Sequence, residues 1–179
     1  MQNLIYSLIQ KLGDDPNRPE LKKTPARVAK AFSYLTEGYN QKLEKIVNNA
    51  LFTAESDNMV ILKNIEFYSL CEHHMLPFFG KCHIGYIPRK KIIGLSKLPR
   101  IIDMFSHRLQ VQERLTEQVA RAIEEAVNPR GVGVVMSAQH LCMMMRGVEK
   151  QSSTTITSAM RGIFREDEKT RAEFLGLIK

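Results

Sequence analysis

Apolar residues near the start of the chain recur at helical spacing, which predicts two N-terminal helices. The apolar positions of the first helix are Leu4, Ile5, Leu8, Ile9 and Leu12. Gly13-Asp14-Asp15-Pro16 ends this pattern, and Thr24-Pro25 begins the next one as an N-cap followed by proline in the first turn. Because residues 40–58 are less regular, we expect residues 1–58 to form a helical region that ends in an irregular connection.

From residue 59 the pattern becomes typical of strands. Segments rich in β-branched and aromatic residues occupy 59–70, 81–87, 133–143 and 153–164. Two amphipathic helices are expected between the second and third strands, the first with Ser96 as its N-cap, and a short helix follows the last strand. This order predicts an α+β domain over residues 59–179, a four-stranded antiparallel sheet with helices on one face. Since another subunit can pair with the free edges of such a sheet, we expect a homo-oligomer.

The composition is that of a soluble globular protein, with 44% of the 179 residues hydrophobic and 25% charged. No apolar run approaches the roughly 20 residues that span a bilayer, and the first helix is amphipathic rather than similar to a signal peptide. No membrane partner is therefore expected. Three cysteines are too few for a secreted disulfide scaffold, which favours a reducing, cytoplasmic compartment.

The net charge of +7 is compatible with nucleic acid, a membrane surface or a polyanion such as a nucleoside triphosphate. Basic residues are spread along the chain, Trp is absent, and the few aromatic residues are not interleaved with basic ones as in a platform for single strands. Nucleic acid is therefore not expected as a partner. Taken alone, the net charge is best explained by a solvated basic surface.

Two short segments, Cys71-Glu72-His73-His74 and His140-Leu141-Cys142, contain two of the 3 cysteines and three of the 5 histidines. Thiolates and imidazoles are zinc ligands, so this concentration indicates a metal site. Cys71 ends a predicted strand, and a turn could bring His74 to the same centre. His140 and Cys142, two apart on a predicted strand, would face the same side.

Two kinds of zinc site differ in the number of protein ligands. Cys71, His74 and Cys142 would leave the position open that a catalytic zinc needs for water, and His73 and His140 would be free to transfer protons. A structural site would need a fourth ligand, for which Cys82 or His83 is the candidate. Paired C-x-x-C knuckles and the zinc deaminase signature are both absent. Alternatively, Cys142 is a small buried hydrophobe and the histidines bind no metal.

An anion site is indicated where a helix is expected to begin. Ser96, Lys97 and Arg100 combine a hydroxyl, two cations on one face and free backbone N–H groups, as in phosphate sites, and Arg146 could add a planar fork. The alternative is solvated surface charge.

A further helix begins at Gln112-Glu113. A Glu there usually interacts with the helix dipole. It could instead accept from the adjacent N1 and N2 donors of guanine, a pair that adenine lacks.

Five motifs occur in the order and spacing of GTP cyclohydrolase I, and the resemblance runs from about residue 25 to residue 175. The motifs are Cys71-Glu72-His73-His74, Gly94-Leu95-Ser96-Lys97, Gln112-Glu113-Arg114-Leu115-Thr116, His140-Leu141-Cys142-Met143 and Met145-Arg146-Gly147. The resemblance implies the tunnelling fold, in which the four-stranded sheets of five subunits close into a barrel and two pentamers stack as a decamer. It also implies that GTP and water give formate and 7,8-dihydroneopterin triphosphate, the first step of pterin and folate-type biosynthesis.

The resemblance also implies roles for single residues. Zinc is the implied cofactor, with Cys71, His74 and Cys142 as ligands. His140 resembles the proton donor to the imidazole ring of guanine, and His73 a further catalytic histidine.

The implied substrate contacts lie in the remaining motifs, and the family builds its sites between subunits. Ser96 resembles the residue near the ribose, and Glu113, with Gln112, resembles the guanine anchor. The residues similar to the triphosphate clamp are Lys97, Arg100 and Arg146. Cys82 matches no motif, and we interpret it as an inert thiol.

Two other classes of function are alternatives to this one. A zinc-stabilised binding module without enzymatic activity would need four protein ligands and would bind nucleic acid in a salt-sensitive way. A pterin enzyme of the same fold would present a similar N–H pair to Glu113, but the thiolate ligands and triphosphate residues favour GTP.

Overall fold

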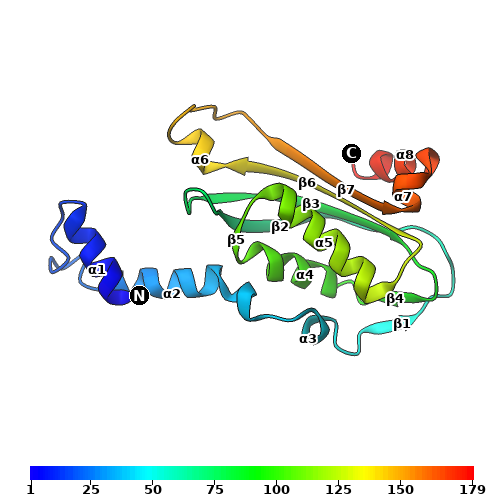
Figure 1. Ribbon diagram of the computed structural model, residues 1–179, viewed down its shortest axis with the longest axis horizontal. Helices are drawn as coiled ribbons and strands as arrows, with labels where there is room; N and C mark the ends of the chain where they lie inside the picture. The colour runs from blue at the N-terminus through cyan, green and yellow to red at the C-terminus, as the bar shows by residue number, and fades with distance from the viewer.

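Five strands form the main sheet of the protein, which a computed structural model describes over residues 1–179 (Figure 1). In chain order they are β2 (Val60–Cys71), β3 (Pro77–Ile87), β5 (Leu109–Gln110), β6 (Gly131–His140) and β7 (Thr155–Gly162). The sheet order is β5-β2-β3-β6-β7, and neighbouring strands are antiparallel except β5 and β2, which are parallel. The α+β class is confirmed. The prediction of four antiparallel strands is wrong because β5, at two residues, is too short to show an alternating pattern.

One face of the sheet is covered by α4 (Lys97–Ser106) and α5 (Gln112–Val127), and the main core lies between the sheet and these helices (Figure 1). Alternate residues of each long strand point into this core, since side chains alternate across a strand. On β2 these are Phe67, Ser69 and Cys71, which are 1%, 2% and 5% exposed. The alternation that buries Phe67 thus carries the thiol of Cys71 to the helix-covered face at the end of the strand.

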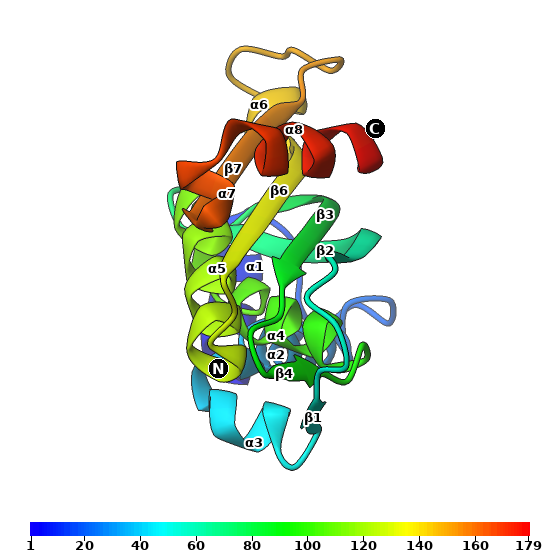
Figure 2. The same ribbon diagram turned by 90° about the vertical axis from the view of Figure 1, so that its right-hand side faces the viewer.

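The opposite face is covered at one end by α7 (Ile163–Glu166) and α8 (Glu168–Leu177) (Figure 2). Phe164 and Phe174 are fully buried there, with ring centroids 5.4 Å apart. They pack on Gly85 and Gly133, where an added Cβ would lie 2.7 Å from a ring carbon. The prediction of helices on one face is therefore wrong for the C-terminal segment, whose aromatic rings fill the space that these glycines leave.

The N-terminal segment contains more regular structure than its sequence pattern predicts. Its elements are α1 (Gln2–Lys11), α2 (Thr24–Leu35), the 3-10 helix η1 (Glu37–Asn40), α3 (Leu43–Val47) and β1 (Leu51–Thr53), which pairs with β4 (Lys91–Ile93). Thr24 is the first helical residue rather than the N-cap, a position held by Lys23 without a side-chain hydrogen bond. Residues 40–58, expected to be irregular, thus contain α3 and β1. The domain boundary at residue 58 stays a prediction.

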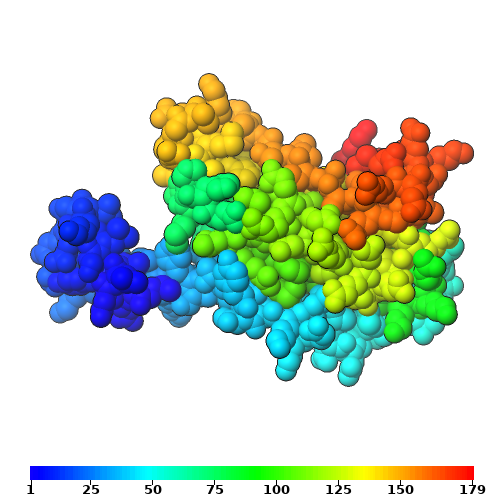
Figure 3. Space-filling model, viewed as in Figure 1, coloured from blue at the N-terminus to red at the C-terminus, as the bar shows by residue number.

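Helices α1 and α2 project from the body of the molecule (Figures 1 and 3). Leu4, Leu8 and Leu12 of this region are 72%, 51% and 76% exposed, whereas Ile9 is buried. The apolar stripe of the first helix is therefore largely uncovered in the single chain. None of the helices combines the length and the apolar character needed to cross a membrane.

Candidate active site

A tight turn after β2 brings two of the predicted metal ligands together. The backbone N–H groups of Cys71 and Met75 donate to Leu76 O and Cys71 O at 2.9 and 2.7 Å, and Met75 takes a left-handed φ of 55°. This geometry places His74 beside Cys71. The ligand atoms of Cys71, His74 and Cys142 all lie within 4.8 Å of one another. The structure therefore brings together the three residues predicted as ligands.

The backbone conformation that places Cys142 in this cluster differs from the predicted strand. Strand β6 ends at His140, and Leu141–Met144 forms the short helix α6. His140 pairs with Phe78, and only Pro77 of β3 lies beyond it. Because proline has no backbone N–H to donate, the ladder between β3 and β6 ends there. The prediction that His140 and Cys142 share one strand face is wrong. The helical turn of α6 carries the thiol of Cys142 round to Cys71 instead.

The donor set fits a soft or borderline divalent metal. Tetrahedral zinc with bonds of about 2.0–2.3 Å holds its ligand atoms roughly 3.5–3.8 Å apart, so the observed cluster needs only a small contraction. Burial, together with the neighbouring Cys71, raises the pKa of the Cys142 thiol. A divalent cation would offset both causes, because it stabilises two adjacent thiolates. All three cysteines are free thiols.

The cluster opens into a small pocket of about 240 Å³. Its lining residues are Cys71, His73, Gln110, Val111, Gln112, Glu113, His140, Cys142, Met143 and Thr155. Both predicted catalytic histidines and the predicted guanine anchor Glu113 therefore lie beside the candidate metal ligands. The volume lies below the roughly 300–1,000 Å³ that is usual for a drug-sized ligand. In the single chain, the pocket holds only part of a large substrate.

His140 is the more firmly held of the two histidines. Its ring stacks on Phe78 at 4.7 Å with an interplanar angle of 1°, and its Nε2 lies 2.8 Å from Gln112 Oε1. Partial burial lowers the pKa of His140, and the nearby Glu113 carboxylate opposes that shift. His73, by contrast, is exposed, with Nδ1 3.8 Å from Cys71 Sγ.

Two arginines border the turn that carries the ligands. Arg146 Nη1 lies 3.5 Å from His74 Nε2, so this predicted clamp residue reaches the metal cluster. Arg114 forms a bidentate pair with Glu72 at 2.6 and 2.9 Å. That pair joins the turn to the first helical turn of α5, and the Arg114 guanidinium lowers the pKa of Glu72. We did not predict this role from the sequence, although both residues lie in the motifs that carry the family resemblance.

The structure does not bring Ser96, Lys97 and Arg100 to this pocket. They lie in the first half of α4 or just before it, and α4 runs from the end near β4 toward β5 (Figure 1). Strand β5 pairs with Leu70 and Cys71, so the metal cluster lies beyond the far end of the helix. Arg100 instead lines a separate pocket of about 250 Å³ with Tyr34, Glu37, Gln41, Ile46, Asp103 and His107. Ser96 precedes the helix but caps it with no side-chain hydrogen bond.

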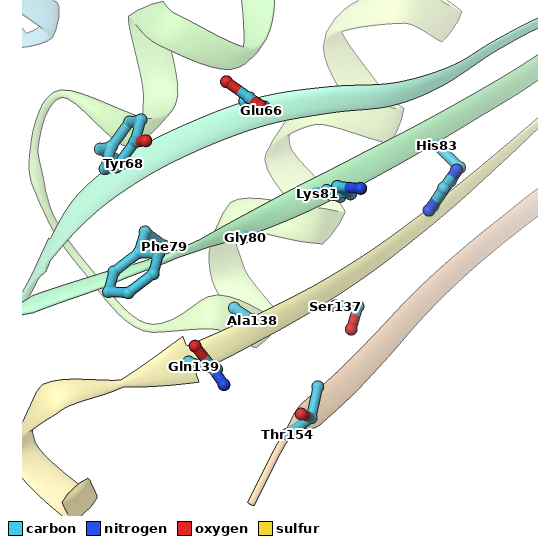
Figure 4. Close-up of a pocket in the computed structure, with 10 residues that line it drawn as sticks. All are labelled: Glu66, Tyr68, Phe79, Gly80, Lys81, His83, Ser137, Ala138, Gln139 and Thr154. Atoms are coloured by element: carbon cyan, nitrogen blue, oxygen red, sulfur yellow. The ribbon is translucent and has the colours of Figure 1, made fainter. Parts of the chain in front are cut away.

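A larger pocket of about 440 Å³ lies on the uncovered part of the other sheet face, and Figure 4 shows its lining. It contains His83 but none of the predicted catalytic, substrate-binding or metal residues. His83 Nδ1 accepts from the backbone N–H of Asn64 at 3.3 Å. Cys82 is fully buried, and burial raises the pKa of its thiol. Neither residue joins the three-ligand group, so neither supplies the fourth ligand of a structural site.

Fold and site together define an α+β protein with a candidate metal centre in a pocket that also presents two histidines and a carboxylate. The sequence model of the family GTP cyclohydrolase I matches residues 1–179. A relative named GTP cyclohydrolase 1 from Methylococcus capsulatus is 60% identical over 178 residues, 99% of this chain and 96% of the relative. One of the same name from Leptospira biflexa is 57% identical over 179 residues, 100% of this chain and 98% of the relative.

The chain belongs to the GTP cyclohydrolase I family. The predictions of this family and of a hydrolytic enzyme are therefore confirmed. Among solved structures, an archaeosine synthase QueF-like protein in its apo form matches with a TM-score of 0.51 and 20% identity. The match covers 60% of this chain and 97% of that protein, and it supports the fold alone.

Proposed function

We propose that this chain converts GTP and water into formate and 7,8-dihydroneopterin triphosphate with zinc as cofactor, the entry step of pterin and folate-type biosynthesis. The single observation that carries the proposal is the cluster of Cys71, His74 and Cys142 at the mouth of a pocket shared with His140 and Glu113. Three ligands leave a coordination position for a non-protein ligand, as in catalytic rather than structural zinc sites.

Each pocket residue has a separate role in the proposed reaction. Zinc, when bound by these three ligands, supplies a Lewis acid that lowers the pKa of water to about 7. Glu113 holds guanine through its N1–H and N2–H groups. His140 delivers a proton to N7 as the imidazole ring opens and C8 leaves as formate. His73, exposed beside Cys71, serves the later proton transfers.

Glu113 suits the role of guanine anchor by its position. It is exposed in the first turn of α5 and lines the pocket next to His140. A carboxylate there accepts two adjacent N–H donors at once, a match that adenine cannot offer. A site built for such a pair rejects the analogue that lacks it, because its polar groups would be left unpaired.

The triphosphate site is built between subunits in this proposal. Lys97 lies at the far end of α4, and a helix of 10 residues is about 15 Å long, so the cation is remote from the metal pocket of its own chain. A neighbouring copy would supply Ser96, Lys97 and Arg100, while Arg146 comes from the chain that carries the metal ligands.

The assembly that we propose is a decamer of two pentamers with the tunnelling fold. Strand β7 is an edge of the sheet, and β5 covers only the last two residues of β2 at the other edge. Free edges of this kind pair readily with another copy. The exposed leucines of the first helix give each copy a further apolar surface to bury.

The test is to incubate protein of measured zinc content with GTP and to measure formate release and the absorbance of the new pterin. We expect both products from GTP and neither from ATP. Cys142→Ser should lose metal and activity, whereas the matched control Cys82→Ala should keep both, because Cys82 lies outside the ligand group. A Cys142→Ser protein with full zinc content and full activity would refute the proposal.

A further inference from the structure

We infer that Gln112 is a positioning residue that fixes the tautomer and the ring orientation of His140, so that His140 acts through Nδ1. The inference rests on the proposed function only in treating His140 as catalytic. It gives Gln112 a different part from the guanine contact that the family resemblance implies. The inference is based on the hydrogen bonds that the Gln112 side chain forms where α5, β6 and β7 meet.

The side-chain amide of Gln112 is buried and fully engaged. The residue is 1% exposed. Its Nε2 donates to Met136 O at 3.2 Å, to Thr155 O at 3.0 Å and to Thr157 Oγ1 at 3.1 Å. Thr157 is in turn 2.6 Å from Thr116 Oγ1. The two amide hydrogens thus have three acceptors on two strands.

These acceptors decide which way the amide points. Met136 O and Thr155 O are backbone carbonyl oxygens, which can only accept. Reversing the amide would place Gln112 Oε1 against both oxygens and leave these two carbonyl groups without the donor that they now have. A carbonyl oxygen that is removed from water and loses its donor is destabilising, so this reversed orientation is disfavoured. Oε1 therefore faces His140.

The orientation of the Gln112 amide determines which ring nitrogen of His140 carries the hydrogen. Gln112 Oε1 accepts and cannot donate, so the contact of 2.8 Å requires a hydrogen on His140 Nε2. In the neutral ring, Nδ1 then carries the lone pair. Nδ1 has no hydrogen-bond partner in the chain and is not among the buried unpaired atoms, so it remains accessible.

The ring has little freedom to turn away from this arrangement. Phe78 is fully buried and parallel to the imidazole, which holds the ring plane. The hydrogen bond at Nε2 fixes the rotation within that plane. Nδ1 is consequently the nitrogen that receives and delivers protons. The amide of Gln112 lines the pocket, but it is engaged by His140 and by the two strands rather than free to bind guanine.

The first test separates positioning from substrate binding. Gln112→Met keeps the length of the side chain and removes the acceptor for His140. We expect kcat to fall about 100-fold, the scale of a displacement of roughly 1 Å in a catalytic group, with KM for GTP changed less than about threefold. Zinc content should not change. Glu113→Ala is the matched comparison, in which KM should rise instead. A Gln112→Met protein with a raised KM and unchanged kcat would overturn the inference.

The second test does not depend on turnover, and its deciding readout comes from the native protein. Solid-state ¹⁵N spectra of histidine-labelled, zinc-loaded native protein report which nitrogen of each neutral imidazole carries hydrogen. We expect a hydrogen on Nε2 of His140, and a mixture of tautomers in Gln112→Met. A native His140 with its hydrogen on Nδ1 overturns the inference even if GTP is converted. Absence of formate from the native protein with the expected spectrum would refute the proposed function alone.

Discussion

Complementation between two inactive variants tests whether the active site spans two subunits. Cys142→Ser removes a metal ligand and leaves the start of α4 intact. Lys97→Ala removes the remote cation and leaves the metal cluster intact. Each variant alone should be inactive or nearly so, because every site in its oligomer lacks one half. Mixed oligomers should regain activity, since a chain with intact metal ligands can meet a neighbour with an intact Lys97.

The expected size of the recovery follows from random assembly. In an equal mixture, half of the metal pockets come from Lys97→Ala chains and half of the neighbouring α4 helices from Cys142→Ser chains. The chain that supplies the metal pocket and the neighbour that supplies α4 are drawn independently from the mixture in a closed ring. About a quarter of the sites therefore combine an intact metal pocket with an intact Lys97. Co-refolded mixtures should therefore show about a quarter of native formate release.

The control for this experiment is the same pair of variants mixed without exchange of subunits. That mixture should remain inactive, which shows that any recovery comes from shared sites. A co-refolded mixture that stays inactive, although mass spectrometry shows mixed oligomers, would refute the argument from the length of α4. It would then follow that each chain carries its own complete site.

Three further predictions concern stability and the ligand-bearing turn. Phe174→Ala should lower the free energy of unfolding by about 3–5 kcal/mol in urea titrations, because the ring is fully buried on Gly85 and Gly133; a change below about 1 kcal/mol would contradict this packing. Hydrogen bonds from Thr170 lower the pKa of Asp167, so the stability it contributes is present above its ordinary pKa of 3.8 and is lost as the pH falls through the lower native value. Asp167→Ala should therefore unfold more easily at pH 7, with a deficit that shrinks below about pH 4; a constant deficit would exclude this cap. Arg114→Ala should weaken zinc binding in chelator competition because the turn loses its tie to α5, and unchanged affinity would show that the turn holds its shape alone.

Much of the fold was predictable because its long strands are half-buried and therefore alternate in hydrophobicity. Residues 65–69 show this alternation clearly, and Cys71 was placed correctly at the end of the strand. What escaped prediction was short or dependent on tertiary contacts. Strand β5 has two residues, and its pairing with β2 depends on where α4 delivers the chain.

In the site, too, the features that depend on tertiary contacts could not be predicted from the sequence. The three ligands could be chosen from residue type and spacing, but the geometry assumed for Cys142 was wrong. The strand pattern of the sequence continues past His140, whereas β3 has only Pro77, without a backbone N–H, beyond Phe78. The backbone therefore leaves the sheet and turns helical. The hydrogen bonds of Gln112 could not be predicted either, since they join a helix to two strands that lie 24 and 43 residues further along the chain.

In the site that we propose, five candidate donors divide into three metal ligands and two proton-handling histidines. X-ray absorption at the zinc edge of the purified protein measures this division directly. We predict two sulfur ligands, one imidazole and one light ligand from outside the protein, with one sulfur lost in Cys142→Ser. A centre with two sulfurs and two imidazoles, or protein that binds no zinc, would contradict it.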